Sequence, residues 1–263
     1  MLHGLTYPGI RVHINENYLF LNDISLVYIP RTSELRFEDN HNEVCRQVPQ
    51  LEKNVILEKV FNYYLGGRKN IYSDHVQFAC PMSTLPPNLN LTINKLETRF
   101  CDFREFLPII NARSFPLKEF KARDNKPVFL NHPVVHSAEK LVFHTNAVNN
   151  MEMFQDLTKL PNKNILIKYD SSDVLAILSV IGSWLIGGKE VGTKYIFSSS
   201  YDRISAGINE ELKDFQVPGT PCFTIPIDAQ SNIQVYRTEV NEDGFLMSQL
   251  VMEVVSKSLE ASK

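Results

Sequence analysis

The sequence predicts an α/β protein with mixed β-sheets flanked by helices, organised as two domains of about 130 residues each. Strand-like and helix-like segments alternate along most of the chain, which is typical of strands joined by packed helices. Hydrophobic residues make up 43% of the 263 positions, enough to form two cores. A polar stretch at 146–150 has the composition of a linker, so we place the domains at residues 1–148 and 149–263.

In the first half, short apolar or alternating stretches predict strands, whereas residues 31–42 are polar and predict a loop. After Pro49 the apolar residues recur at helical spacing, and the glycine pair at 66–67 predicts the end of that helix. The Phe115-Pro116 dipeptide leads into another strand. The expected elements are strands at 9–14, 18–21, 24–29, 76–79 and 116–120 and helices at 51–65 and 93–106.

The second half has a clearer pattern. Residues 174–186 are apolar nearly all round a helix, which predicts a buried helix, and Asp173 can cap its N-terminus. The C-terminal segment has apolar residues four apart, at 246, 250 and 254, which predicts a final helix. The expected elements are strands at 164–169, 194–198, 222–227 and 233–240 and helices at 174–186, 209–214 and 244–259.

Composition excludes several classes of function. A net charge of -3 without a cluster of Lys and Arg gives no footprint for nucleic acid. The longest apolar run, at 174–186, is too short to span a bilayer, so we expect no membrane span. The sequence shows no signal peptide at Met1. This does not decide against secretion, because Met1 is also what a methionine added to the mature part of a secreted protein would look like. Asn90-Leu-Thr92 is a glycosylation acceptor only if the chain is secreted.

The chemistry-bearing residues give no recognisable catalytic or metal motif. The four cysteines include no C-x-x-C pair and have no metal-ligand spacing. The proline after His132 argues against a helix that would bring the histidines at 132 and 136 onto one face. We expect no metal and no cofactor. Glu119-Phe-Lys121 with Asp102 imitates the E-x-K pattern of nucleases. We set that interpretation aside because the chain is acidic and Asp102 falls in an expected helix.

The stretch 215–228 carries a resemblance to a known family. A helix tail, the Thr220-Pro221 turn, a hairpin and a final helix resemble the C-terminal half of a thioredoxin-like domain of the protein disulfide isomerase kind. In that fold the proline before the strand is cis, so the resemblance implies a cis bond before Pro221. Phe115-Pro116 is a weaker copy of the same arrangement. The resemblance implies two thioredoxin-like domains, with a peptide-binding surface around Pro116, Thr220, Pro221 and Cys222.

The first half adds a second likeness. The order Phe78-Ala-Cys80, Arg99-Phe-Cys101 and Phe115-Pro116 resembles the first thioredoxin domain of quiescin sulfhydryl oxidases. In that domain two such cysteines form a local structural disulfide, so the resemblance implies a Cys80–Cys101 bond. The family's C-x-x-C motif is degenerate here. Cys45 replaces at best its resolving cysteine, near the N-terminus of the following helix, and Asn42 stands where the attacking thiol would be.

We therefore expect a redox-inactive thioredoxin-like protein that binds a protein or peptide partner, as a chaperone, adaptor or scaffold in the secretory pathway (endoplasmic reticulum or secreted). The alternative is an enzyme, a fragment of a sulfhydryl oxidase or disulfide isomerase with single-cysteine chemistry at Cys45. In a third hypothesis the fold serves only as a rigid structural subunit. An insulin-reduction or thiol-oxidase assay separates the enzyme from the binding protein.

Overall fold

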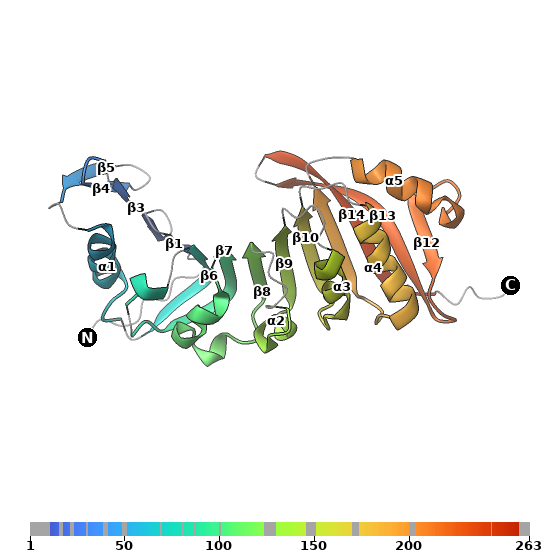
Figure 1. Cartoon of the computed structure of the whole chain (residues 1–263), viewed down its shortest axis with the longest axis horizontal. Helices are drawn as coiled ribbons and strands as arrows, with labels where there is room; N and C mark the ends of the chain where they lie inside the picture. Colours follow the sequence, from blue (N-terminus) through green and yellow to red (C-terminus); the bar gives the residue numbers. More distant parts are fainter. Residues whose placement is uncertain are drawn as a thin grey trace. The chain divides into compact units, whose positions relative to one another are not determined.

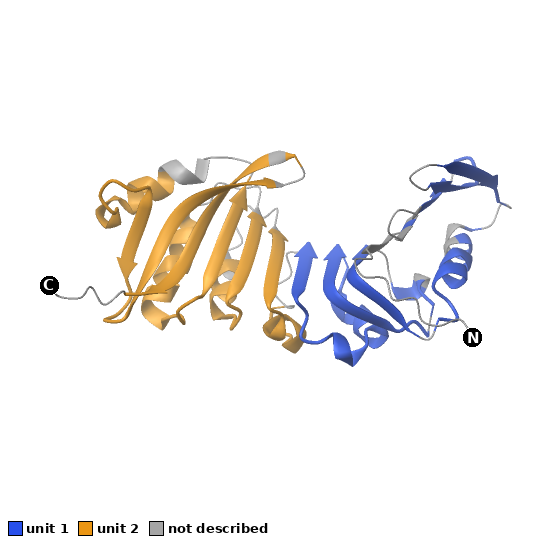
Figure 2. Cartoon of the chain, turned by 180° about the vertical axis from the view of Figure 1, so that it is seen from behind, with its two compact units in different colours: residues 1–123 blue, residues 124–263 orange. Residues whose placement is uncertain are grey.

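The computed structural model describes residues 11–15, 18–21, 24–29, 31–38, 42–48, 52–68, 70–79, 82–86, 88–99, 101–123, 130–145, 151–169, 174–199, 203–242 and 244–257. It confirms the mixed α/β class. The chain forms two compact units, residues 1–123 and 124–263 (Figure 2). The boundary predicted after residue 148 lies within the second unit.

The centre of unit 1 is a set of parallel strands, β6 (Ile71–Ala79), β7 (Leu91–Arg99) and β8 (Glu119–Arg123). Strand β1 (Arg11–Asn15) runs parallel to β6 on its other side. The predicted helix at 93–106 is wrong, because its first part is β7. Residues 103–109 instead form the 3-10 helix η2 (Phe103–Ile109), which covers the sheet.

The parallel strands of unit 1 have one apolar face, and their other face becomes polar toward the carboxyl ends of the strands. On the apolar face, Phe78 stacks on Phe106 of η2 with 4.1 Å between ring centroids, and Phe103 meets Phe120 edge-on at 5.0 Å. All four rings are at most 1% exposed, so this is the core of the unit. The opposite face carries the charged side chains of the same strands, because successive residues of a strand point to opposite sides.

An antiparallel ribbon extends from β1. It consists of β2 (Tyr18–Leu21), β3 (Ile24–Ile29), β4 (Glu34–Glu38) and β5 (Glu43–Gln47), each paired with the next. Helix α1 (Lys53–Tyr64) follows and lies beside the ribbon (Figure 1). The strands at 18–21 and 24–29 and the helix are confirmed, whereas the loop predicted at 31–42 contains β4.

Unit 2 is built on the parallel strands β9 (Lys140–Thr145), β10 (Asn164–Tyr169) and β11 (Lys194–Ser199). Helices α3 (Met151–Lys159) and α4 (Val174–Gly187) connect them and lie on one face of the sheet; seen from behind, the strands lie in front of these helices (Figure 2). The short helix α2 (Pro133–Ser137) precedes β9. Asn162 holds its last turn by donating to the carbonyls of Val135, His136 and Ala138.

Three antiparallel strands complete unit 2: β12 (Cys222–Pro226), β13 (Ser231–Glu242) and β14 (Phe245–Ser256), and β14 pairs with β11. Helix α5 (Arg203–Glu211) and the 3-10 turn η5 (Lys213–Phe215) lead into β12. The predicted C-terminal helix at 244–259 is wrong. A four-residue spacing keeps residues on one face of a strand as well as on one face of a helix. The spacing at 246, 250 and 254 therefore did not discriminate between a helix and a strand.

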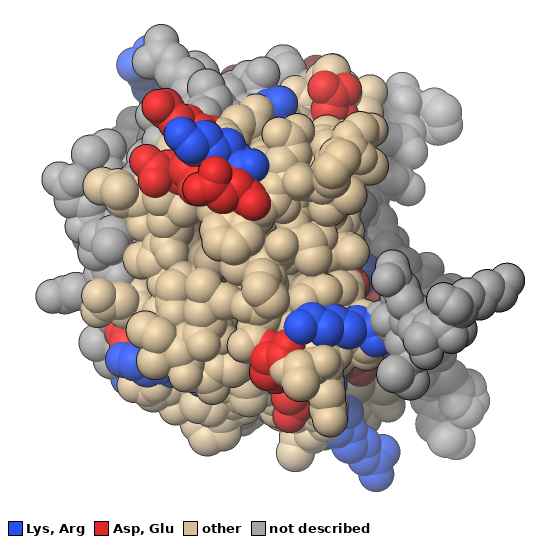
Figure 3. Space-filling view, turned by 90° about the vertical axis from the view of Figure 1, so that its right-hand side faces the viewer, with Lys and Arg blue, Asp and Glu red and all other residues tan. Residues whose placement is uncertain are grey.

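Helix α4 is only partly buried. Trp184 is fully buried and meets Tyr195 edge-on at 4.8 Å, whereas Ile186 is 92% exposed and Leu175 is 69% exposed. No helix within the described ranges is long and apolar enough to cross a membrane. The side of the chain where β12 and α5 lie is largely uncharged, with charged groups toward its margins (Figure 3). The segment 215–227 contains no charged residue.

Candidate functional site

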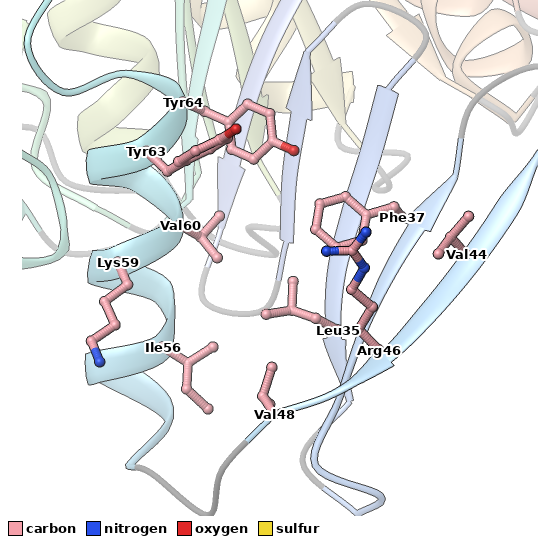
Figure 4. Close-up of a pocket in the computed structure, with 10 residues that line it drawn as sticks. All are labelled: Leu35, Phe37, Val44, Arg46, Val48, Ile56, Lys59, Val60, Tyr63 and Tyr64. Atoms are coloured by element: carbon pink, nitrogen blue, oxygen red, sulfur yellow. The ribbon is translucent and has the colours of Figure 1, made fainter.

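A groove of about 690 Å³ lies between helix α1 and the ribbon strands β4 and β5 (Figure 4). This volume is within the range of pockets that hold ligands or short peptide segments. Strand and helix side chains face each other across it in the close-up. The lining residues are Leu35, Phe37, Val44, Arg46, Val48, Ile56, Lys59, Val60, Tyr63 and Tyr64.

Both walls follow from the periodicity of their elements. On the helix, Ile56 and Val60 are four residues apart and buried, so they form the floor of the groove. On β4, Leu35 and Phe37 face the groove and alternate with charged residues that point away from it. On β5 and directly after it, Val44, Arg46 and Val48 are two residues apart and share the face toward α1, so this wall is apolar with one cationic side chain at its centre.

Large apolar groups remain exposed around the groove. Tyr63 is 80% exposed and Val44 47% exposed. Tyr63 packs edge-on against Tyr64 with 5.0 Å between ring centroids. Burial, followed by the proximity of Tyr63, raises the pKa of Tyr64, and the nearby charge of Arg46 opposes this shift. The ring of Tyr63 is thus available to a ligand that covers the groove, and Tyr64 supports it from the partly buried side.

The charged groups that line the groove have one sign. Arg46 and Lys59 are both cationic, and the lining contains no carboxylate. The acidic residues of the ribbon lie on its other face, where Arg36 pairs with Glu43 at 3.1 Å and Gln47 donates to Glu34 at 2.8 Å. The groove accordingly favours an apolar ligand that carries a negative charge.

Strand β5 is the terminal strand of the ribbon, and all five of its residues are exposed. Within the described ranges β4 is its only strand partner. The outer edge of β5 therefore presents backbone N–H and C=O groups to which an extended chain can add.

The end of α1 that borders the groove depends on a glycine. The Leu65 N–H bonds to the Phe61 carbonyl at 2.7 Å, and Gly67 has a φ of +71°. A Cβ on Gly66 would lie 2.3 Å from the carbonyl oxygen of Asn62. Only glycine fits at residue 66 without a shift of the helix end that carries Tyr63 and Tyr64.

Cys45 is not at the N-terminus of a helix, contrary to the sequence interpretation. It lies on β5, opposite Arg36 of β4, and its Sγ is 3.6 Å from Oε1 of Glu43. Alternation along β5 places it on the polar face of the ribbon, away from the groove.

The two X-Pro turns differ from the expectation. Phe115–Pro116 is the cis bond of the described residues, and Thr220–Pro221, expected to be cis, is not. Thr220 lies in an exposed turn, where its N–H and its Oγ1 both bond to the Val217 carbonyl at 3.1 Å. Cys222 begins β12, and burial raises the pKa of its thiol. Pro116 lies in unit 1 and the other three predicted residues lie in unit 2.

The predicted Cys80–Cys101 disulfide is not present. The described part of the chain contains no disulfide, Cys80 lies outside it, and the Cys101 thiol donates to the Phe78 carbonyl at 3.4 Å. No group of acidic, His or Cys residues within the described ranges could hold a metal ion. Of the nuclease-like residues, Asp102 caps η2 and Lys121 pairs with Glu97.

Most of the groove was not predicted from the sequence. Helix α1 was expected, but β4 was assigned to a loop, and Cys45 was the one residue of β5 considered as a site residue. The missing signal was the alternation in E-L-R-F-E at 34–38, two apolar residues between three charged ones. This is the pattern of a strand with one buried face.

The chain belongs to the family described as a domain of unknown function (DUF3557), whose sequence model matches residues 54–201, more than half of its length. The match begins in α1 and ends beyond β11, so it covers parts of both units. No curated protein and no solved structure matches the chain.

Proposed function

We propose that the protein is a non-catalytic binding module that takes up an extended polypeptide segment along the outer edge of β5. The observation that carries this proposal is an edge strand, β5, whose outer side has no strand partner within the described residues, beside an apolar groove. Backbone pairing provides affinity in this mode of recognition, and alternate side chains provide specificity. Exposed Tyr63 and Val44 give the incoming side chains an apolar contact surface.

The groove predicts a sequence pattern for the partner. Val44, Arg46 and Val48 are the groove-facing positions of this segment of β5. A strand added beside them places its own groove-facing side chains opposite these three. The best complement is an apolar residue, an acidic residue and a second apolar residue, each separated by one residue of any type.

We also keep, as part of this proposal, the prediction from the sequence that the protein is thioredoxin-like and redox-inactive. It is supported by the sequence, which has no C-x-x-C pair, and by the position of Cys45 beside a carboxylate. The strand β14, in place of the expected final helix, departs from the thioredoxin layout. The location in the secretory pathway stays a prediction. Turnover of insulin disulfides by the wild-type protein would favour the oxidoreductase alternative.

A charge-swap binding experiment tests the proposal. The probe is a fluorescein-labelled peptide, Thr-Val-Thr-Glu-Thr-Val-Thr, measured by fluorescence polarisation beside a copy with Lys in place of Glu. We expect the wild type to prefer the Glu peptide. Arg46→Glu should reverse that preference. In this variant the Lys peptide forms the interstrand pair of opposite charge, and the Glu peptide places two like charges opposite each other.

Matched substitutions locate the binding surface. Tyr63→Ser should weaken binding of the Glu peptide about tenfold, the effect of losing roughly 1.4 kcal/mol of contact. Tyr72→Ser removes another exposed tyrosine, 41% exposed and on β6, and should not change binding. Equal binding of both peptides by wild type and Arg46→Glu would rule out recognition at this groove.

A further inference from the structure

A second cluster of unit 1, on the polar face of β6 to β8, is independent of the groove. Glu97 lies at its centre, with its side chain 2% exposed. Its carboxylate accepts from Arg99 Nε at 2.7 Å and from Lys121 Nζ at 3.0 Å. His75 Nε2 lies 3.6 Å away and Arg123 Nε 3.9 Å away. One carboxylate is therefore surrounded by four potentially cationic groups from three strands.

The positive charge of this cluster exceeds what Glu97 neutralises. Arg99, Lys121 and Arg123 bring three cationic side chains to the single carboxylate of Glu97, an excess of two that does not count His75. The other charged groups of this face, Lys95, Asp74 and Glu119, lie toward the amino ends of the strands, and Asp74 pairs with Lys95 at 3.0 Å.

The arrangement of the two arginines is unusual for a structural network. Arg99 and Arg123 are direct partners in the β7–β8 register, and each is the last residue of its strand. Like charges directly opposite each other destabilise a pair of strands. The carboxyl ends of parallel strands are also where α/β proteins bind their ligands.

Two buried polar atoms point to a missing partner. Gln77 is 6% exposed and lies directly opposite Glu97 in the β6–β7 register. Its Nε2 has no hydrogen-bond partner within the described ranges, and the buried Nε of Arg123 has none either. Buried donors without partners are costly, so each of these two groups is a place where the acceptor oxygens of a bound ligand would be favourable. The side chains of His75, Arg99, Lys121 and Arg123 are 21–35% exposed, so solvent reaches them.

We propose that this cluster, defined by His75, Gln77, Glu97, Arg99, Lys121 and Arg123, binds a phosphate group. The planar forks of Arg99 and Arg123 suit bidentate contacts to a tetrahedral oxyanion, and Lys121 adds a third charge. Gln77 supplies a neutral donor. Glu97 is a positioning residue, because its contacts with the Arg99 Nε and Lys121 Nζ hold these side chains in place and leave the terminal guanidinium nitrogens of Arg99 to the ligand.

Isothermal titration of the full chain with inorganic phosphate tests this site, with sodium chloride at matched ionic strength as the comparison. We expect saturable binding of phosphate and none of chloride. Arg99→Gln and Arg123→Gln should each weaken phosphate binding at least about tenfold, the effect of one charge-assisted contact. Arg113→Gln, on the exposed 3-10 turn η3 (Ala112–Ser114), is the matched control and should leave binding unchanged.

Glu97→Gln separates a ligand site from a structural network. If phosphate shares the cations with Glu97, removal of the carboxylate should strengthen phosphate binding severalfold, and phosphate should raise the melting temperature of this variant more than that of the wild type. Titrations with O-phosphoserine and with adenosine monophosphate then show whether the phosphate is carried by a peptide or by a nucleotide. The proposal would be overturned if neither wild type nor Glu97→Gln bound phosphate saturably, or if both arginine variants bound phosphate as tightly as the wild type.

Discussion

Glu97→Gln should destabilise unit 1 by about 3 kcal/mol. The substitution keeps the shape of the side chain and removes its charge, so Arg99 and Lys121 lose their counter-ion. Removal of one partner from a fully buried ion pair costs about 3–5 kcal/mol. We expect the lower end here, because Lys121 and Arg99 are 21% and 30% exposed and keep part of their hydration. The melting temperature should fall by between about 5 and 12 °C, depending on whether the two units unfold together or separately.

The effect should depend on pH in one direction. Burial of Glu97 raises its pKa, but the contacts with His75, Arg99 and Lys121 outweigh burial and hold the pKa well below its usual range. A carboxyl with a lowered pKa stabilises the folded state above its unfolded pKa, about 4.3, and this contribution is lost as the pH falls further. The stability difference between wild type and Glu97→Gln should therefore be constant from pH 6 to 8 and shrink below about pH 4.

Circular dichroism melts at pH 7 and in acid measure this difference. Trp184 is the single tryptophan of the chain and lies in unit 2, so its fluorescence follows that unit separately. The control is Asp74→Asn, which breaks a pair whose side chains are 34% and 40% exposed and should cost less than about 1 kcal/mol. Equal stability of wild type and Glu97→Gln at pH 7, or a difference that does not shrink in acid, would refute the electrostatic reasoning.

Three other substitutions test the packing. Asn162→Asp places a carboxylate against three carbonyl oxygens and should cost about 3 kcal/mol or more in urea unfolding, whereas a loss below 1 kcal/mol would mean that the amide does not hold α2. Gly66→Ala should cost more than about 1 kcal/mol and weaken peptide binding at the groove, because its Cβ meets the Asn62 carbonyl; an unchanged melting temperature would contradict this geometry. Trp184→Phe should lower the free energy of unfolding by only about 1 kcal/mol, since the buried indole N–H has no partner within the described ranges. Trp184→Ala should lower it by about 3–5 kcal/mol, because it removes the whole ring from the core. Equal losses for the two variants would contradict a role of Trp184 in packing alone.

The sequence predicted those elements whose local pattern and packing agree. Strand β10 and helix α4 were identified within one residue because a short apolar run and a long one, each followed by a break, leave few alternatives. Strands β7 and β14 were missed because the stretch 93–106 and the positions 246, 250 and 254 each contain apolar residues three or four apart, a spacing typical of a helix. In β14 the valines at 251, 254 and 255 and the Asp243-Gly244 dipeptide were signals of a hairpin strand that the spacing outweighed.

The predicted site residues were separated by the fold for a different reason. Pro116 and Pro221 were selected by a resemblance between turns, and a short turn does not fix which unit or surface it belongs to. The groove, in contrast, depends on the alternation of β4 and β5, which a charged stretch with isolated apolar residues signals only weakly. Its chemistry could be predicted once the register between the ribbon strands was known, because the register determines which charges share a face.

The sequence of strand β7 indicates that one of its faces binds a ligand. Parallel strands covered on both sides are nearly continuous runs of apolar residues, because both faces are removed from water. Strand β7 has a parallel partner on each side and packs its Leu91, Ile93 and Leu96 into the unit, yet it carries Glu97 and Arg99 within three residues of its end. Local rules are broken chiefly where function requires it. The departure begins where the strands reach their carboxyl ends, so the face that breaks the apolar rule is also the face on which a charged ligand would be bound.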